Sequence, residues 1–176
     1  MMIAGIIIVL ILLALLFTLS LIRKHDREDH MIYFSKEKRS PVRLVSLTDD
    51  EFRFEFDVPY ANPGTGEGIF LDAFARVYLP DEQYNGALLR GRVNHSTRPR
   101  EDDYFEAMLI PPGSKDYLTM KFDLVPRNGK KTAKEAVLTM PDVEVALYVA
   151  RRGRGPLFYD KENILITREE LKALVK

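Results

Sequence analysis

The sequence predicts an all-β protein: an immunoglobulin-like antiparallel β-sandwich of about seven to eight strands, preceded by one transmembrane helix and closed by a short C-terminal amphipathic helix. Three observations lead to this prediction. Residues 2–22 carry no charged side chain. In several later segments apolar side chains alternate with polar ones, which is typical of strands that bury one sheet face. A helix-capping sequence, Thr167-Arg-Glu-Glu170, stands close to the C-terminus.

Residues 1–22 are predicted to form a transmembrane anchor. As a helix, the uncharged run 2–22 spans about 31 Å, which matches a hydrocarbon core of about 30 Å. A cleaved signal peptide is the alternative. The apolar run is longer than the usual ~7–15 residues of a signal peptide. No basic residue precedes it, so an uncleaved anchor is favoured.

Residues 23–31 are predicted to be a charged juxtamembrane stalk that leads into the sandwich domain, 32–176. Basic side chains gather on this side of the span, and cytoplasmic flanks are rich in Lys and Arg. We therefore expect the domain in the cytoplasm and the N-terminus outside. The basic residues concerned are Arg23, Lys24, Arg27, Lys36, Lys38, Arg39 and Arg43.

Alternating apolar side chains predict three strands with one buried face, at 52–58, 118–124 and 143–149. The segment 69–79 has apolar groups on both faces, which predicts a central strand. Weaker patterns, separated by Gly, Pro, Asn and Asp, predict the remaining strands at 41–47, 87–93, 104–110 and 164–166.

Two short helices are predicted among the strands. Residues 132–139 fit one or two turns at the edge of the sandwich. The helix 167–175 begins with a capping box, in which Thr167 caps the first turn and Glu170 reaches back to it. Its apolar side chains are Leu171, Leu174 and Val175, which share one face at helical spacing.

Residues 56–64 (FDVPYANPG) resemble the strand-to-Asn-Pro turn of late-embryogenesis-type sandwich domains. The resemblance covers nine residues, and no site is carried over from it. The Cys and Trp hallmarks of antibody domains are absent, because the chain contains neither residue. The likeness to the immunoglobulin fold is therefore one of architecture.

Composition excludes several functional classes. With no Cys, the chain has no disulfide scaffold, thiolate zinc site or thiol nucleophile. Basic and acidic side chains balance at 26 each, whereas nucleic-acid-binding domains are strongly basic. We therefore expect no nucleic-acid partner.

Three patterns were tested for chemistry. The loop 62–68 is rich in Gly, but no Lys-Ser/Thr or helix follows it, which favours an inter-strand loop over a phosphate cradle. His25 and His30 lack metal-site spacing on a helix. His95 and Ser96 are adjacent and point apart, which favours a solvated polar loop over a catalytic relay. No catalytic, cofactor or metal residue is assigned, and no cofactor is expected.

Acidic groups at 49–51 and 101–103 raise the alternative of a calcium site. Neither has the alternating ligands and glycine of an EF-hand loop. Charged loop ends of a β protein are the favoured interpretation.

Arg151, Arg152 and Arg154 form the densest basic cluster, with no acidic residue before Asp160. Such a cluster suits anionic lipid headgroups or an acidic or phosphorylated protein partner. The alternative is a hairpin tip with solvated arginines.

The sequence thus predicts a single-pass membrane protein whose sandwich is a non-enzymatic interaction or structural module. Its expected partners are the bilayer, through residues 2–22, and an anionic lipid or protein surface. No small-molecule substrate is identified. The alternative is a membrane-tethered hydrolase that uses loop carboxylates or a metal.

Overall fold

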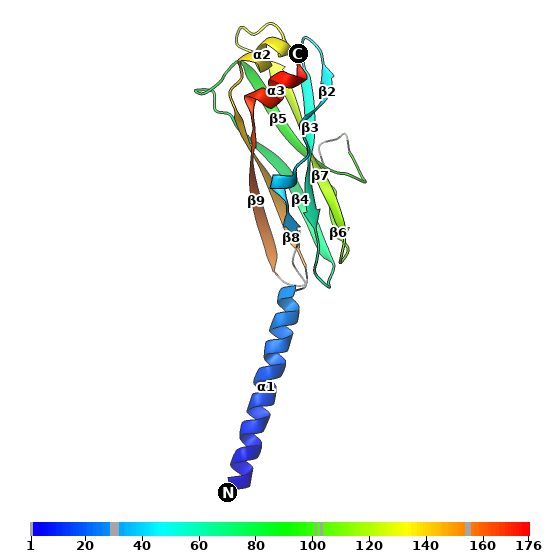
Figure 1. Cartoon of the computed structure of the whole chain (residues 1–176), viewed down its shortest axis with the longest axis vertical. Coiled ribbons are helices and arrows are strands. Elements are labelled where there is room, and N and C mark those ends of the chain that lie inside the picture. The colour runs from blue at the N-terminus through cyan, green and yellow to red at the C-terminus, as the bar shows by residue number, and fades with distance from the viewer. Residues whose placement is uncertain (1, 29–31, 101, 103, 154–155) are drawn as a thin grey trace.

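The computed structural model contains one long helix and a mostly β domain built from two antiparallel sheets that curl around a common core (Figure 1). It describes residues 2–28, 32–100, 102, 104–153 and 156–176. The prediction of a mainly β architecture with a helix at each end is confirmed at this level.

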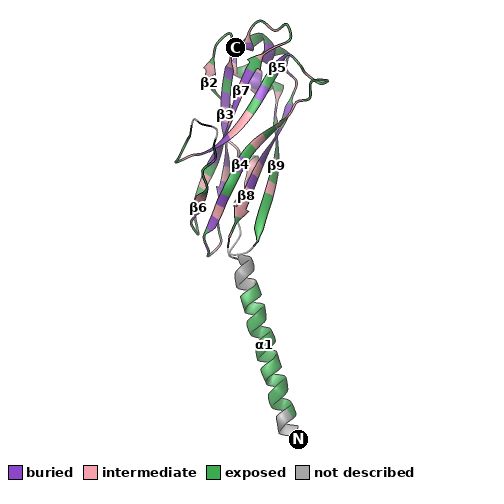
Figure 2. Cartoon of the chain, turned by 180° about the vertical axis from the view of Figure 1, so that it is seen from behind, coloured by how far each residue is buried: buried purple, intermediate pink, exposed green. Residues whose placement is uncertain are grey.

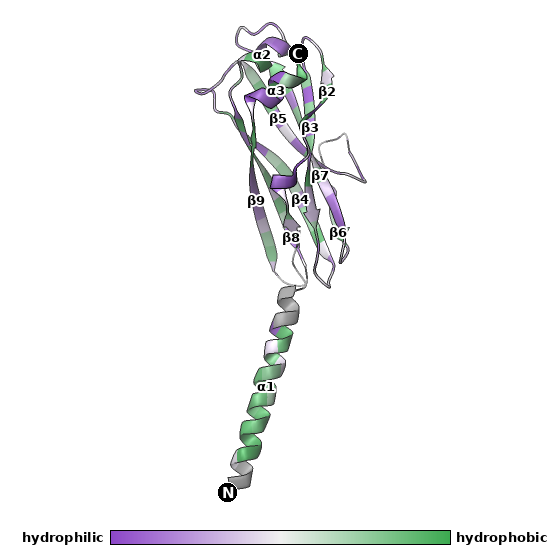
Figure 3. Cartoon of the chain, in the orientation of Figure 1, coloured by the Kyte–Doolittle hydropathy of each residue, from purple (hydrophilic) through white to green (hydrophobic). Residues whose placement is uncertain are grey.

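Helix α1 (Met2–Glu28) extends away from the strands, and its side chains are exposed from residue 5 to residue 23 (Figure 2). Apolar residues cover most of its length (Figure 3). The segment Gly5–Arg23 is long and apolar enough to cross a membrane, with a mean hydropathy of 3.1. A signal sequence near the N-terminus meets the same criteria.

The first sheet has the strand order β1-β3-β7-β5, and β2 pairs with the first half of β3. The short 3₁₀ helix η1 (Lys36–Lys38) follows β1. The strands are β1 (Tyr33–Phe34), β2 (Arg43–Leu47), β3 (Phe52–Ala61), β5 (Ala87–His95) and β7 (Lys115–Pro126).

The second sheet has the strand order β6-β4-β8-β9. Its strands are β4 (Gly68–Tyr78), β6 (Met108–Ile110), β8 (Val143–Arg152) and β9 (Leu157–Ile166). The described residues thus hold nine strands, one more than the eight segments predicted, because β1 was missed. The predicted strand 164–166 is only the end of β9. Its earlier residues show no alternation because β9 is an edge strand and none of residues 157–163 is buried.

The alternating strands bury the predicted faces. Phe52, Phe54, Phe56 and Val58 are at most 1% exposed. Phe122 of β7 stacks on two of these rings, with centroids 5.0 Å from Phe54 and 5.6 Å from Phe56. Burial of one such side chain contributes about 1.5–3 kcal/mol. The core therefore lies between the two sheets, as the buried stripes along the strands show (Figure 2).

Strand β4 lies between β6 and β8, so its predicted central position is confirmed. The register shifts between Phe70 and Asp72, and this irregularity changes which residues face the core. Phe70 and Ala73 are both buried, whereas Phe74 is 51% exposed. A strict period of two cannot predict such a change of phase.

Helices α2 (Ala133–Thr139) and α3 (Arg168–Leu174) lie at the end of the sandwich far from α1 (Figure 1). Thr132 caps α2 by accepting from the backbone N–H of Glu135. The predicted capping box of α3 is present in full, because Thr167 and Glu170 cap each other's backbone N–H groups. Leu171, on the predicted apolar face, is buried.

Candidate functional site

Strand register identifies the end of the sandwich to which α1, the predicted anchor, is joined. Tyr33, only five residues after the end of α1, pairs with Ala61, the last residue of β3. Five residues reach at most about 17 Å. The same end holds the β3–β4 and β6–β7 turns and the β8–β9 hairpin, because Gly68 pairs with Ile110 and Ile69 with Arg152. We call it the anchor end.

The predicted basic cluster lies in the β8–β9 hairpin at the anchor end. Arg151 is half-buried and forms an ion pair with Asp160, with 3.3 Å between Nη2 and Oδ1. Its guanidinium lies 5.2 Å from the centre of the Phe158 ring. Arg152 is exposed and ends β8. Arg154 lies outside the described residues. The hairpin places Asp160 beside Arg151. An acidic side chain therefore partly neutralises the basic cluster, which the sequence alone does not show.

Apolar side chains accompany these arginines. Leu157 and Tyr159, at the start of β9, are 42% and 75% exposed. Tyrosine is enriched where proteins meet the membrane–water interface, because its ring is apolar and its hydroxyl is polar. The hairpin therefore presents a mixed basic and aromatic surface.

The Gly-rich loop 62–68 joins β3 to β4, as the inter-strand interpretation predicts. Buried Asn62 holds it in place: its Nδ2 donates to the carbonyls of Gly66 and Ile110, both at 3.0 Å. Its Oδ1 accepts from the backbone N–H of Gly64 at 3.1 Å. The loop is thus fastened to the β6 side of the anchor end.

The prediction that His95 belongs to a solvated loop is wrong. His95 ends β5 and is 6% exposed, with its ring against Tyr60 of β3. His25 and His30 have side chains outside the described residues. The error arose because the polar run that follows His95 concealed the inward phase of the strand before it.

Hydrogen bonds fix the tautomer of His95. The backbone N–H of Thr97 donates to Nδ1 at 3.2 Å, and the Thr97 hydroxyl lies 2.8 Å from the same atom. Nδ1 is therefore an acceptor, and the ring hydrogen of the neutral imidazole is on Nε2. Nε2 lies 2.9 Å from the Tyr60 hydroxyl and 3.6 Å from Asp116 Oδ2. The imidazole joins β3 and β7 to the loop after β5.

These contacts do not form a nucleophile–base pair. Ser96 Oγ donates to Asp116 Oδ1 at 2.5 Å and not to His95. Both ring nitrogens of His95 already have partners. A general base needs a free nitrogen within hydrogen-bond reach of the nucleophile. This geometry does not favour a Ser–His relay at His95.

Burial lowers the pKa of His95 below its usual value, and nearby Arg98 lowers it further, whereas Asp116 raises it. Burial also raises the pKa of Tyr60, with Asp116 adding to the effect, so its hydroxyl stays protonated. The site is therefore built around neutral imidazole and neutral phenol at pH 7.

Acid should destabilise the domain through His95. The unfolded chain binds a proton near pH 6.5, before the folded protein does, so the free energy of unfolding falls as the pH drops below about 6.5. Chemical denaturation of the full chain in detergent at pH 7, 6 and 5 measures this loss. His95→Gln should shrink it, because the substituted side chain does not titrate. Equal slopes for the two proteins would contradict the assignment.

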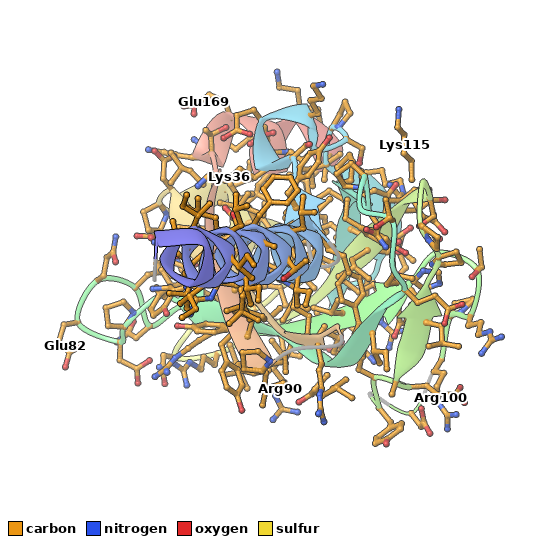
Figure 4. All side chains as sticks on the ribbon, turned by 90° about the horizontal axis from the view of Figure 1, so that it is seen from below. Lys36, Glu82, Arg90, Arg100, Lys115 and Glu169 are labelled. Carbon is orange, nitrogen blue, oxygen red and sulfur yellow. The ribbon has the colours of Figure 1, made fainter. Side chains whose placement is uncertain are left out.

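A pocket of about 450 Å³ opens beside Tyr60 and His95. Thr97, Arg98 and Lys115 bring polar groups to it, and Met108 contributes an apolar wall. In the view along α1, the Lys115 side chain projects outward from the domain (Figure 4). The pocket thus lies at the anchor end, beside the β6–β7 turn.

The acidic groups considered for calcium lie apart. Residues 49–51 form the turn between β2 and β3, where the carbonyl of Asp49 accepts from the N–H of Ala133 at 2.7 Å. Asp102 pairs with Arg100, and residues 101 and 103 lie outside the described part of the chain. No group of three or more His or acidic side chains suited to a metal occurs within the described residues.

Sequence reasoning missed Tyr60 and Asp116. Each keeps the phase of an alternating buried series one step beyond it: buried Tyr60 follows Val58, and half-buried Asp116 precedes Leu118. His95 likewise continues the inward series of β5 beyond Val93. Polar residues at the inward-facing ends of neighbouring strands were therefore the available signal.

No protein-family model matches the sequence, and no curated protein matches it significantly. Solved structures with a similar fold include a Northeast Structural Genomics Consortium target, with 10% identity and a TM-score of 0.43 over 79% of this chain and 88% of that one. The putative ApaA protein from Bordetella pertussis has 13% identity and a TM-score of 0.41, over 77% and 92%. The yeast GGA1 GAE domain has 10% identity and a TM-score of 0.35, over 71% and 97%. No role follows from likenesses at this level.

Proposed function

We propose that the protein is a single-pass membrane protein whose sandwich is a non-enzymatic interaction module held with its anchor end against the bilayer. The observation that carries this proposal is the register that places the anchor and the β8–β9 hairpin at the same end. The candidate span ends at Arg23, so the last five residues of α1 and the five that follow, about 25 Å at most, separate this end from the lipid.

The hairpin has the chemistry for such a contact. Each Lys or Arg near an anionic surface contributes about 1 kcal/mol. Arg152, Leu157 and Tyr159 together offer charge, apolar surface and an interfacial ring. Such a contact is too weak to hold a free protein, and it is sufficient to orient one that is already tethered.

The sandwich itself is proposed to be of immunoglobulin type. Its β1-β3-β7-β5 sheet and the β4-β8-β9 part of the other sheet follow the ABED and CFG orders of a constant-type domain. Domains of this type present rigid faces and end loops for binding. The α2–α3 end lies far from α1 (Figure 1). In the proposed orientation it points away from the membrane and is accessible to a protein partner.

A depth measurement tests the proposal. The chain has no Cys, so Tyr159→Cys and Glu82→Cys each give a unique labelling position, at the anchor end and in the loop between β4 and β5. Ten strand residues separate the two ends by about 33 Å. In nanodiscs with headgroup spin-labelled lipid, we expect a fluorophore at position 159 to be quenched and one at position 82 to stay bright.

Charge dependence provides the control for this contact. Quenching at position 159 should increase with anionic lipid and fall in 1 M salt, where the Debye length is about 3 Å. Arg152→Ser should weaken it. Arg151→Ser is unsuitable because it also breaks the ion pair with Asp160 inside the hairpin. Equal quenching at the two positions, or none at either, would refute the orientation.

A further inference from the structure

The pocket beside Tyr60 and His95 plays no part in the lipid contact proposed for the hairpin. It is a partly enclosed space of about 450 Å³ whose inner wall is made by two nearly fully buried polar side chains. Known small-ligand sites occupy about 300–1,000 Å³ and place a few polar groups on an otherwise apolar lining. We propose that this pocket binds a phosphate monoester group.

A hydrogen-bond donor faces the pocket without an acceptor. Because Nδ1 of His95 accepts from Thr97, its Nε2 carries the hydrogen and donates to the Tyr60 hydroxyl. The Tyr60 hydroxyl hydrogen then has no acceptor among the residues that the structure describes. An anion oxygen in the pocket would accept it.

Two cations lie at the opening. Arg98 and Lys115 both line the pocket and are exposed. In the described part of the chain neither has an ion-pair partner. Guanidinium and ammonium groups form short, charge-assisted hydrogen bonds to phosphate oxygens. Tyr60, Arg98 and Lys115 come from β3, the loop after β5 and the start of β7, so three separate segments of the chain bring donor residues to the pocket.

Asp116 determines which anion fits. Its Oδ1 accepts from Ser96 at 2.5 Å and from the backbone N–H of Tyr117 at 2.8 Å. Its Oδ2 accepts no hydrogen bond from the residues that the structure describes and lies 3.6 Å from His95 Nε2. A carboxylate oxygen repels an anion that has no proton to donate. A phosphate monoester, with a second pKa of about 6, retains a P–OH that can donate to Oδ2 near that pH. Sulfate and phosphodiesters carry no such proton.

The remaining wall admits an organic group. Ala107, Met108, Leu109 and Pro111 supply apolar surface beside the polar groups. The monoester can therefore belong to a small soluble molecule or to a lipid such as phosphatidic acid. A lipid is a candidate because Tyr60 pairs with Phe34 of β1, which lies close to the anchor. The shared chemistry is the singly protonated monoester.

Calorimetric titration of the full chain in phosphatidylcholine nanodiscs at pH 6 tests the inference. Inorganic phosphate and glycerol 3-phosphate should bind saturably, and sulfate at least about tenfold more weakly. Arg98→Gln should weaken phosphate binding by about 10-fold or more, because it removes a charge-assisted bond. Tyr60→Phe should weaken it about fivefold. Lys130→Gln, at the far end, should leave it unchanged.

A separate variant tests the preference for phosphate over sulfate. Asp116→Asn replaces the repelling oxygen, so sulfate should gain affinity until it approaches phosphate. Arg98 is exposed and Asp116 is half-buried. Equal melting temperatures of the variants and the unmodified chain establish that the fold is kept. A merely structural role for these residues would leave the sulfate-to-phosphate ratio unchanged.

Nanodiscs that contain phosphatidic acid or phosphatidylglycerol show whether the bound monoester belongs to a lipid or to a soluble molecule. Competition by phosphatidic acid and not by phosphatidylglycerol assigns the monoester to lipid, whereas preference for glycerol 3-phosphate assigns it to a soluble molecule. Absence of phosphate binding up to about 10 mM, equal sulfate binding, or insensitivity to Arg98→Gln would overturn the inference. None of these results depends on whether the hairpin touches the bilayer.

Discussion

Replacing Phe54 by aspartate will unfold the sandwich. Phe54 is 1% exposed and stacks on Phe122, directly opposite in the sheet. The substitution removes about 3–5 kcal/mol of core packing and buries a carboxylate at a cost of several more. Domains of this size are stable by about 5–15 kcal/mol in total. Circular dichroism of the full chain should show that the sheet signal is lost, while the helix in detergent remains.

The neighbouring residue provides the matched control. The Arg53 side chain is 50% exposed and makes surface ion pairs with Glu51 and Asp123, at 2.9 and 3.4 Å. Such pairs contribute about 0–1 kcal/mol each. Arg53→Gln should therefore lower the melting temperature only slightly, and Phe54→Leu should retain the fold. Similar unfolding of Arg53→Gln and Phe54→Asp would contradict the strand phase.

Local periodicity explains why much of the fold was predictable. In β3, β7 and β8 every second side chain is buried, and this pattern is visible in the sequence without knowledge of strand pairing. The cap of α3 is equally local, because Thr167 and Glu170 are three residues apart. The irregularity in β4 depends on its register with β8, which no local pattern records.

The candidate site was less predictable because its contacts join distant segments. Tyr60 and Asp116 are directly opposite in the β3–β7 ladder, and His95 reaches them from β5. Each residue alone looked like the polar end of a strand. The Arg151–Asp160 pair was hidden in the same way, since a hairpin turn separates its partners. Pairing of strands, and not composition, creates both arrangements.

Two arginines in the middle of α1 will release the protein from membranes. Leu12 and Leu13 lie near the centre of the span Gly5–Arg23. An arginine at a helix centre costs about 2.5–3.5 kcal/mol in insertion experiments, so Leu12→Arg with Leu13→Arg opposes insertion by about 6 kcal/mol. After alkaline extraction, the unmodified chain should stay in the pellet and the double variant should be soluble. Leu12→Ala with Leu13→Ala should behave like the unmodified chain.

The side of the membrane is decided by labelling Glu82→Cys, the single thiol of that variant, with an impermeant maleimide. We expect no labelling in intact cells and full labelling after lysis, because the basic residues that follow the span favour a cytoplasmic domain. Labelling in intact cells would place the domain outside. A mature protein that lacks the mass of about the first 20 residues would identify the segment as a cleaved signal. In that case the arginine pair would block export instead of releasing an anchored protein, so the two experiments together separate an anchor from a signal.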